Sequence, residues 1–534
     1  MPKNQNPTCG QALLRLLEHY GVDIVFGIPG VHTLELYRGL VDSPIRHVLA
    51  RHEQGAAFMA DGYARISGKP GVCFLITGPG ITNASTAVAQ AYSDSVPMLV
   101  LTSVNRTDTL GRGWGELHEL ADQQAVTAPF TAFGASVREP QELPGLIEKA
   151  FQVFDGQRPR PVHIEIPIDV LAMAVSPGWA ARRSAGPPKP SEQSIKEALG
   201  LLGKARRPLI YAGGGAKRAA SAVRGIAEKV AAPVVTTVAG IGMLPGDHPL
   251  NAGATLPSEA TLQLVAEADV VLAIGTELSE NDTWGCPLKI NGALIRIDID
   301  PRKLTDRFPA RVAIHADAGF ASKAIAEALA DSVANDRAAA EARVQRAREA
   351  FQKTLGDSER KHQRVLELVQ RIAPRETVYV GDMTQIAYTA YRCMAFDAPA
   401  RFFNPKGYGT LGYALPAVIG ARLGAPETPL VALTGDSGVL YTIQEMATAT
   451  DEGASVVVLL WNNQSLKAIR DGFEALGIEP IGTTPWNPDY QQLARAFGWN
   501  AVRVRHPAAL EIALKDALAA DGATLIELNE SDDF

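Results

Sequence analysis

The stretch Leu430–Asn463, LVALTGDSGVLYTIQEMATATDEGASVVVLLWNN, decides the fold of this chain. An apolar run ends in the turn GDSG, a helix-like stretch follows, and a second apolar run ends in Asn462 and Asn463. A strand, a helix and a second strand form a parallel pair, and the carboxyl ends of parallel strands share the sheet edge where α/β proteins bind ligands. We therefore expect Asp436 and Asn463 to face each other at that edge.

The residue types at this edge predict a metal-bridged diphosphate site. A carboxylate, an amide oxygen, backbone carbonyls and phosphate oxygens form the hard oxygen shell that Mg²⁺ prefers. The turn of Gly435, Ser437 and Gly438 exposes backbone N–H groups at a helix N-terminus, which suits a diphosphate. An Asp in an ordinary turn and a later Asn pair are each common, but their combination at this spacing is much more specific.

Short β-branched runs alternate with helix-like stretches along the rest of the chain, which indicates parallel sheets covered on both faces. The fold class is therefore α/β, with three doubly wound, mostly parallel-sheet domains. We place these domains at residues 1–175, 191–335 and 363–534. Ser176–Ser191 reads as a linker rich in Pro, Gly, Arg and Ser, and Asp331–Gln363 as an exposed connecting helix.

Composition excludes several classes of protein. The chain has 534 residues, of which 46% are hydrophobic and 20% charged, so wholesale disorder is excluded. The net charge of −7 lacks the basic excess of a nucleic-acid-binding protein. The four cysteines form no CxxC, which argues against disulfides and structural zinc and suits a reducing cytoplasm. No signal peptide or membrane span is expected.

The GDSG turn followed by the Asn pair resembles the signature of the thiamine diphosphate (ThDP) enzyme superfamily, GDG and then NN. The resemblance implies that Asp436, Asn463 and the carbonyl of Ser465 bind Mg²⁺, which holds the diphosphate of ThDP.

A second group of motifs resembles the pyrimidine-binding domain of the same superfamily. The matching segments are FGIPG at 26–30, HEQGA at 52–56, GYAR at 62–65 and GPGITN at 78–83. The resemblance implies that Glu53 stabilises a proton on the aminopyrimidine ring, which works best in a dry pocket. It also implies cofactor contacts by Pro29, Gly30, Thr77 and Asn83. Taken alone, Glu53 would be an exposed carboxylate at a helix start.

Two further segments resemble cofactor loops of the superfamily. In NPKGYGTLGYALP, residues 404–416, Leu411 matches the residue that wedges under the thiazolium, and the Gly409 carbonyl would accept from the aminopyrimidine. The alternative is a glycine-rich turn between a strand and a helix, with Leu411 as an ordinary core residue. In GDMTQ, residues 381–385, Thr384 and Gln385 would contact the diphosphate.

The resemblance covers nearly the whole chain, in the domain order of acetohydroxyacid synthases and 2-oxo acid decarboxylases. It implies a homodimer or homotetramer whose active site lies at the subunit interface, with Glu53 and Asp436 from different subunits. In the middle domain, LIYAGGGAKR, residues 209–218, has Arg218 where a dinucleotide fingerprint needs its third glycine, so we do not expect FAD.

The substrate is expected to be a small-molecule 2-oxo acid with a cationic end. Where the synthases carry arginines in the middle domain, this chain has Glu277, Glu280 and Asp282; Ile469 and Asp471 follow the Asn pair. An opposite charge in a partly dry site would favour a guanidinium or ammonium group. The nearest family resemblance is to decarboxylases of arginine catabolism that act on 5-guanidino-2-oxopentanoate (2-ketoarginine). These acids could also be exposed rim residues.

His118 and Glu119 resemble the loop that carries a histidine pair in pyruvate decarboxylases and a glutamine in the synthases. A histidine there could donate the proton that a decarboxylase requires, or it could be an ordinary loop residue. An acetolactate synthase-like carboligase acting on pyruvate is the main alternative. A catalytically silent binding subunit and a flavin or nicotinamide oxidoreductase are the other classes considered.

Overall fold

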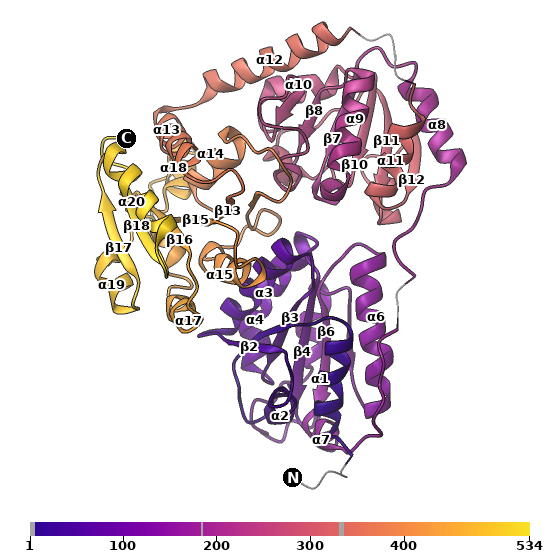
Figure 1. Ribbon diagram of the computed structural model, residues 1–534, viewed down its shortest axis with the longest axis vertical. Helices are drawn as coiled ribbons and strands as arrows, with labels where there is room; N and C mark the ends of the chain where they lie inside the picture. The colour runs from indigo at the N-terminus through magenta and orange to yellow at the C-terminus, as the bar shows by residue number, and fades with distance from the viewer. Residues whose placement is uncertain (1–5, 183–184, 331–335) are drawn as a thin grey trace. The chain divides into compact units, whose positions relative to one another are not determined.

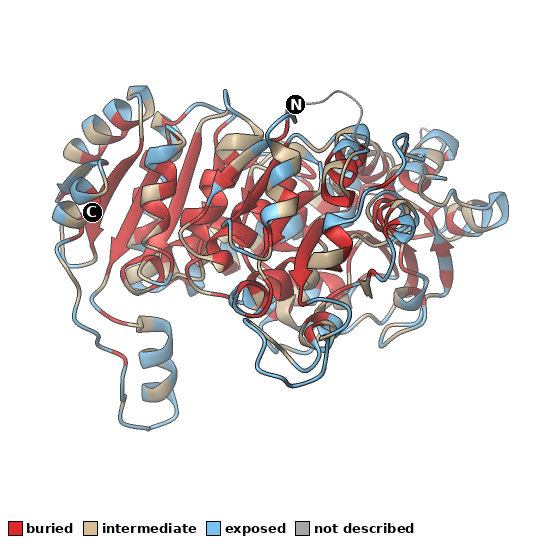
Figure 2. Cartoon of the chain, turned by 90° about the horizontal axis from the view of Figure 1, so that it is seen from below, coloured by how far each residue is buried: buried red, intermediate tan, exposed pale blue. Residues whose placement is uncertain are grey.

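The computed structural model describes residues 6–182, 185–330 and 336–534. It contains three six-stranded parallel sheets, each flanked by helices (Figure 1). Most central strands are buried along their whole length, as β6 (Val162–Pro167) is, because helices cover both faces (Figure 2). The predicted α/β fold class is confirmed.

The N-terminal sheet has the strand order β2-β1-β3-β4-β6-β5. Its strands are β1 (Ile24–Gly27), β2 (Arg46–Leu49), β3 (Gly71–Leu75), β4 (Met98–Val104), β5 (Phe133–Ser136) and β6. Its helices are α1 (Cys9–His19), α2 (Leu34–Leu40), α3 (Glu53–Ser67), α4 (Pro79–Ser93), α5 (Gln123–Thr127), α6 (Leu143–Gly156) and α7 (Ile168–Ala172). One apolar core joins α1, α6 and α7 to one face of this sheet.

The middle sheet has the order β12-β11-β10-β7-β8-β9, which is the dinucleotide-binding order of doubly wound folds. Its strands are β7 (Pro208–Ala212), β8 (Val234–Thr236), β9 (Asn251–Gly253), β10 (Val270–Ile274), β11 (Ala293–Asp298) and β12 (Val312–His315). Its helices are α8 (Glu192–Leu202), α9 (Ala220–Val230), α10 (Glu259–Ala266) and α11 (Ala318–Ala328).

The C-terminal sheet has the order β14-β13-β15-β16-β18-β17, the same pattern as the N-terminal sheet. Its strands are β13 (Val378–Gly381), β14 (Phe402–Phe403), β15 (Leu430–Gly435), β16 (Val457–Asn462), β17 (Asn500–Val504) and β18 (Thr524–Asn529). Its helices are α14 (Gln385–Cys393), α15 (Ala414–Gly424), α16 (Asp436–Val439), α17 (Glu445–Asp451), α18 (Lys467–Ala475), α19 (Tyr490–Ala496) and α20 (Pro507–Ala519).

The chain divides into two compact units. The first comprises residues 1–186, 380–384 and 404–532, and the second comprises 187–379, 385–403 and 533–534. Within the first unit, α3 packs directly against α15. A Cβ on Gly62 would lie 2.0 Å from the Ala417 carbonyl oxygen, and one on Gly420 would lie 1.9 Å from that of Met59. Glycine is therefore required where these two helices touch.

One prediction was wrong: the connection before the third sheet is not a single helix. A single exposed helix was expected over Asp331–Gln363, of which residues 331–335 lie outside the described part. The structure has two helices, α12 (Arg337–Thr354) and α13 (Asp357–Ile372). Gly356 separates them, with its N–H bonded to Glu359 at 3.0 Å, and α12 buries Val344 and Phe351.

Candidate active site

Asp436 lies where β15 ends and α16 begins, with 2% of its surface exposed. Its carboxylate accepts a hydrogen bond from the Asn487 amide at 2.7 Å, and its carbonyl accepts one from the Tyr490 hydroxyl at 2.9 Å. Burial raises the pKa of Asp436. A buried carboxylate of this kind is stabilised by a cation.

The loop after β16 lies beside Asp436. The parallel register pairs Gly435 with Trp461, so each strand delivers its next residue to the same edge. The backbone N–H of Gln464 donates to Asn462 Oδ1 at 3.1 Å, and the Asn487 amide that donates to Asp436 also donates to Asn462 Oδ1 at 3.3 Å. Asn463 Oδ1 accepts from the N–H of Ser465 at 3.1 Å, which fixes the side chain within the loop. The structure thus brings Asp436 together with the loop carrying Asn463 and Ser465.

The two glycines of the GDSG turn differ in the space above them. A Cβ on Gly435 would lie 2.8 Å from Thr384 Oγ1, and one on Gly438 would lie 3.5 Å from the Asp382 carboxylate. The Ser437 hydroxyl is buried with no hydrogen-bond partner. Gly435, Ser437, Gly438 and Thr384 therefore lie together, whereas Gln385 begins α14 in the second unit.

Asp382 is a buried residue that the sequence analysis did not select. Its carboxylate accepts from the backbone N–H groups of Met383 at 2.8 Å and Gly412 at 3.2 Å, and from that of Ala414 at 3.4 Å. Burial raises the pKa of Asp382 to about 6. Its position directly after β13, at the same edge as Asp436, was the available sequence signal.

Two glycines determine the backbone conformation of the loop of residues 404–416. Gly409 has φ +77° and Gly412 has φ +78°, both in the left-handed region. Leu411 is only half-buried, although the residues after it are buried. Its side chain is therefore partly available to a ligand.

These residues fit the implied cofactor. Asp436, the Asn463 amide and the Ser465 carbonyl supply oxygen donors of the type Mg²⁺ prefers. The partnerless Ser437 hydroxyl and the N–H groups at the start of α16 are suited to phosphate oxygens. Within the described residues no cluster of three or more His, Cys, Asp or Glu side chains suits a metal, so any ion here would rely on amide and carbonyl ligands.

Glu53 is the first residue of α3 and is 9% exposed. The side chain of His52 caps the helix by accepting from the N–H of Gln54 at 3.1 Å. One Glu53 oxygen accepts from the Asn83 amide at 2.9 Å, so two predicted cofactor residues are in direct contact.

The other predicted pyrimidine-side residues lie in turns of the same domain. Thr77 is fully buried, and its hydroxyl lies 3.2 Å from that of Ser103. Gly30 belongs to a tight turn in which its N–H donates to Thr33 Oγ1 at 2.9 Å, and Pro29 is exposed just before it.

Glu445 was also missed by the sequence analysis. It is fully buried at the start of α17, and its carboxylate accepts from the backbone N–H of Arg51 at 3.1 and 3.2 Å and from the Thr448 hydroxyl at 2.8 Å. A Cβ on Gly55 would lie 2.3 Å from Glu445 Oε1. Burial raises the pKa of Glu445 to about 7. Glu445 therefore braces the turn that presents Glu53.

His118 lies beside the GPG turn in a strained conformation. Its φ is +60°, and a Cβ on Gly78 would lie 2.4 Å from its carbonyl oxygen. Its neighbour Glu119 accepts from the backbone N–H groups of Gly113 at 2.7 Å and Gly115 at 2.8 Å. Slight desolvation alone would raise the pKa of Glu119, but these hydrogen bonds outweigh it and lower the pKa. Glu119 thus anchors its own loop.

The predicted substrate acids differ in their surroundings. Glu277 pairs with Lys303 at 2.8 Å, and Asp471 pairs with Lys467 at 2.7 Å. Asp282 accepts from the Ser279 hydroxyl at 3.0 Å, and Glu280 is exposed. Ile469 is 57% exposed on α18, a helix with no buried residue.

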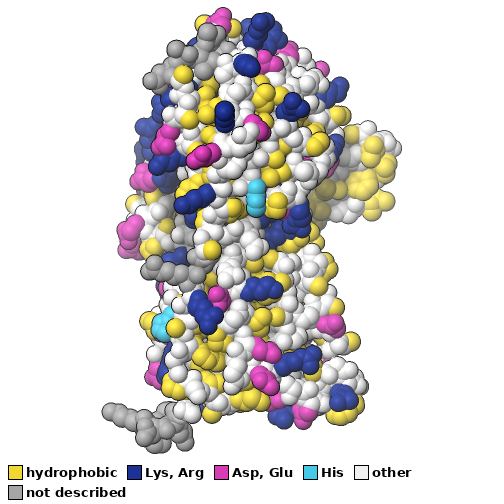
Figure 3. All heavy atoms as spheres, turned by 90° about the vertical axis from the view of Figure 1, so that its right-hand side faces the viewer, with side chains coloured by type: hydrophobic (Ala, Val, Ile, Leu, Met, Phe, Trp, Pro, Cys, Tyr) yellow, Lys and Arg dark blue, Asp and Glu magenta, His cyan; other side chains and the backbone are white. Residues whose placement is uncertain are grey.

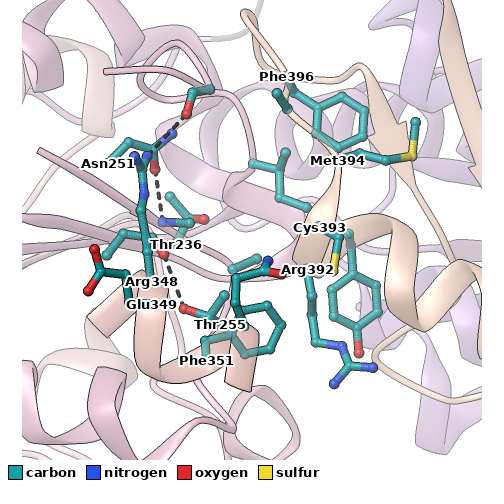
Figure 4. Close-up of a pocket in the computed structure, with 18 of the residues that line it drawn as sticks. Thr236, Asn251, Thr255, Arg348, Glu349, Phe351, Arg392, Cys393, Met394 and Phe396 are labelled. Atoms are coloured by element: carbon teal, nitrogen blue, oxygen red, sulfur yellow. Dashed lines mark hydrogen bonds between the residues drawn. The ribbon is translucent and has the colours of Figure 1, made fainter. Parts of the chain in front are cut away.

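The second unit contains a cavity of about 580 Å³. It lies between the β8–β9 region, α12 and the end of α14, as Figure 4 shows for Thr255, Phe351 and Cys393. Arg348 is anchored by the carbonyls of Gly246 and His248 at 3.1 and 3.3 Å. The residues that line this cavity include none of those predicted to bind ThDP.

The exposed surface carries charges of both signs. On the face in Figure 3, Lys and Arg side chains are interspersed with acidic ones. Among the described residues, no helix is long and apolar enough to cross a membrane.

Three family models match the chain. They are the N-terminal TPP-binding domain of thiamine pyrophosphate enzymes at residues 7–126, the central domain at 195–329 and the C-terminal TPP-binding domain at 382–528. The chain therefore belongs to the thiamine pyrophosphate enzyme family, and it is a ThDP-dependent enzyme. Thiamine pyrophosphate and ThDP are the same cofactor.

Curated relatives cover nearly the whole chain. It is 52% identical over 534 residues to the "probable 2-ketoarginine decarboxylase AruI" of Pseudomonas aeruginosa, covering 99% of this chain and 95% of that protein. It is 31% identical to acetolactate synthase isozyme 1 large subunit of Escherichia coli, covering 98% and 93%. It is 33% identical to acetolactate synthase of Mycobacterium bovis, covering 93% and 84%.

Proposed function

We propose that this enzyme is a ThDP- and Mg²⁺-dependent decarboxylase that converts 5-guanidino-2-oxopentanoate to CO₂ and the corresponding aldehyde. The observation that carries the proposal is the 52% identity, over 99% of the chain, to a probable 2-ketoarginine decarboxylase. The acetolactate synthases are more distant, at 31–33% identity. We place the enzyme in the cytoplasm, in arginine catabolism.

The residues have distinct parts in this proposal. Bound ThDP supplies a carbon nucleophile that attacks the 2-oxo group and accepts the electron pair released with CO₂. Asp436, Asn463 and the Ser465 carbonyl would hold Mg²⁺ against the diphosphate. Glu53 would hold a proton on the aminopyrimidine, with Asn83 orienting it at 2.9 Å. Pro29, Gly30, Thr77, Thr384, Gln385, Gly409 and Leu411 would complete the cofactor site.

The substrate end of the site is also a proposal. The residues proposed for recognition of the guanidinium group are Glu277, Glu280 and Asp282 of the second unit, and Ile469 and Asp471 of the first. Lys303 and Lys467 pair with two of these acids, which weakens the attraction of those two for a cationic substrate. His118 would serve the proton transfer, and Glu119 would hold its loop.

A substrate comparison tests the activity. The purified enzyme with ThDP and Mg²⁺ is assayed for kcat/KM with 5-guanidino-2-oxopentanoate, pyruvate and phenylpyruvate, and the products are identified. We expect the guanidino acid to be preferred and its aldehyde to be the product. Acetolactate formed from pyruvate as the main product would instead establish the carboligase alternative.

The subunit arrangement has a sharper test. We propose a homodimer or homotetramer in which Glu53 of one subunit acts with Asp436 of its partner. Glu53→Gln and Asp436→Ala are each expected to be inactive. Mixing the two variants after subunit exchange should restore roughly a quarter of the activity, because half of randomly formed dimers are hybrids with one intact site of two. No restoration despite proven exchange would contradict a shared site.

A further inference from the structure

His32 and His118 form a contact that no motif assigns. Their imidazole rings lie 5.4 Å apart between centroids at an interplanar angle of 67°, an edge-to-face arrangement. The Nδ1 atom of each ring is buried and has no hydrogen-bond partner. Two polar ring atoms left unpaired side by side are costly, which marks the pair as a candidate for function.

The backbone holds both histidines in place. His32 lies in the turn after β1, where Thr33 Oγ1 accepts from the N–H of Gly30 at 2.9 Å and donates to its carbonyl at 3.0 Å. His118 lies in the connection after β4, and Asn105 Nδ2 donates to the Leu117 carbonyl at 2.9 Å. Hydrogen bonds in two separate loops, one after β1 and one after β4, therefore fix the positions of the two histidines.

Both connections leave the same edge of the sheet as the GPG turn. The strands β1, β3 and β4 are adjacent, and Gly78 follows β3. Gln123 joins the turn to the His118 connection, because its Oε1 accepts from the N–H of Gly78 at 2.9 Å and its Nε2 donates to the Ser103 carbonyl at 3.1 Å. The histidine pair thus belongs to the edge that carries Glu53.

The charges facing the pair limit its protonation. Desolvation lowers the pKa of His32, the neighbouring His118 lowers it further, and Glu116 opposes both. Two imidazolium ions at this distance repel each other. The surroundings of His32 and its neighbouring imidazole thus disfavour a second positive charge on the pair. Glu119, next to His118 in the chain, accepts hydrogen bonds from backbone amides.

We propose that His32 and His118 act as one acid–base pair that supplies the proton consumed in decarboxylation. This inference rests on the proposed function. When the C–C bond to CO₂ breaks, its electron pair passes to bound ThDP and becomes available again at the former carbonyl carbon. That carbon forms a C–H bond with a proton from the pair, an imidazolium N–H breaks, and water returns a proton to the neutral imidazole. The sum is 2-oxo acid anion plus H⁺ giving aldehyde plus CO₂.

The experiment separates CO₂ release from aldehyde release. His32→Gln, His118→Gln, the double variant and His19→Gln are compared as holoenzymes, using the 2-oxo acid that the wild type turns over best. His19 is an exposed histidine at the end of α1 and serves as the matched control. We expect His32→Gln to lower steady-state aldehyde formation about 100-fold while the rapid-quench burst of CO₂ per site is retained.

Two further readouts distinguish chemistry from structure. The double variant should lose no more activity than the worse single variant, because the two rings act as a unit. Added imidazole should partly restore aldehyde formation to His32→Ala, which keeps the test decisive if the Gln variant folds poorly. Activity of His32→Gln equal to that of His19→Gln, parallel losses of CO₂ and aldehyde, or multiplicative losses in the double variant would overturn the pair. A wild type that releases no aldehyde from any 2-oxo acid would refute the proposed function instead.

Discussion

The N-terminal and C-terminal sheets share one strand order but present different chemistry at equivalent positions. In each sheet the third strand of the pattern ends in a glycine turn that opens a helix, with Pro79 first in α4 and Asp436 first in α16. Both residue types suit a first helical turn. The comparison teaches that the two sheets provide the same backbone frame, and that at this position they differ in whether the side chain carries a negative charge.

The largest expected effect comes from removing that side chain. Asp436→Ala should lower turnover by about 1,000-fold or more, because a metal contributes several kcal/mol to the reaction. The matched change Pro79→Ala, at the equivalent position, should leave turnover within about threefold, because that turn has no metal ligand to lose. Steady-state kinetics over a Mg²⁺ titration measures both. Equal losses of turnover in the two variants would contradict the proposal that only the C-terminal turn carries a metal ligand.

The joint between the two sheets should be the most sensitive point for stability. Arg65 on α3 bonds to Asp61 at 2.6 Å and Asp94 at 2.7 Å, and Tyr413 of the C-terminal domain donates to Asp61. Arg65→Met leaves the fully buried Asp61 and the partly exposed Asp94 without their cation and should cost about 3–5 kcal/mol of unfolding free energy. Arg38→Met, which breaks only an exposed pair with Glu35, should cost less than about 1 kcal/mol.

Urea denaturation of the two arginine variants measures this difference. Comparable midpoints would show that the buried cluster does not hold the two domains together. Retained activity in Arg65→Met at low temperature would place its effect on stability and not on the site.

The sequence predicted what depends on local pattern. The parallel order of β15 and β16 and the turns after them follow from apolar runs and glycines, so the proximity of Asp436 to the Asn463 loop was predictable. Glu445 was not, because its partner Arg51 is 394 positions away. The break between α12 and α13 was missed because Gly356 alone ends the pattern. His32 was missed because its partner, His118, belongs to a different connection.

The burial of Glu445 predicts that the free energy of unfolding depends on pH. Burial raises its pKa from 4.5 to about 7, so between these values the folded chain keeps a proton that the unfolded chain has lost. The free energy of unfolding should therefore fall as pH rises through this window, by about 3 kcal/mol from this group. Glu445→Gln should remove that part of the slope.

The measurement is the difference between wild-type and variant unfolding free energies from pH 4.5 to 8. Glu35→Gln, which removes the partner of the exposed Arg38 on α2, is the control and should track the wild type. Parallel wild-type and Glu445→Gln curves would mean that the N–H groups around Arg51 stabilise the charged carboxylate more than burial disfavours it.

The two glycine turns themselves differ in how much a methyl group should disturb them. Gly78 has φ +67°, and a Cβ there would lie 2.4 Å from a backbone oxygen, that of His118. At Gly438 the nearest atom to a Cβ would be 3.5 Å away, an ordinary contact. Gly78→Ala should therefore cost about 2 kcal/mol, and Gly438→Ala should cost less than about 1 kcal/mol. Denaturation without cofactor isolates this difference, because Gly438→Ala would also crowd the diphosphate. Equal costs would mean that the N-terminal turn relaxes freely, and the conformation of His118 would then not depend on its packing against Gly78.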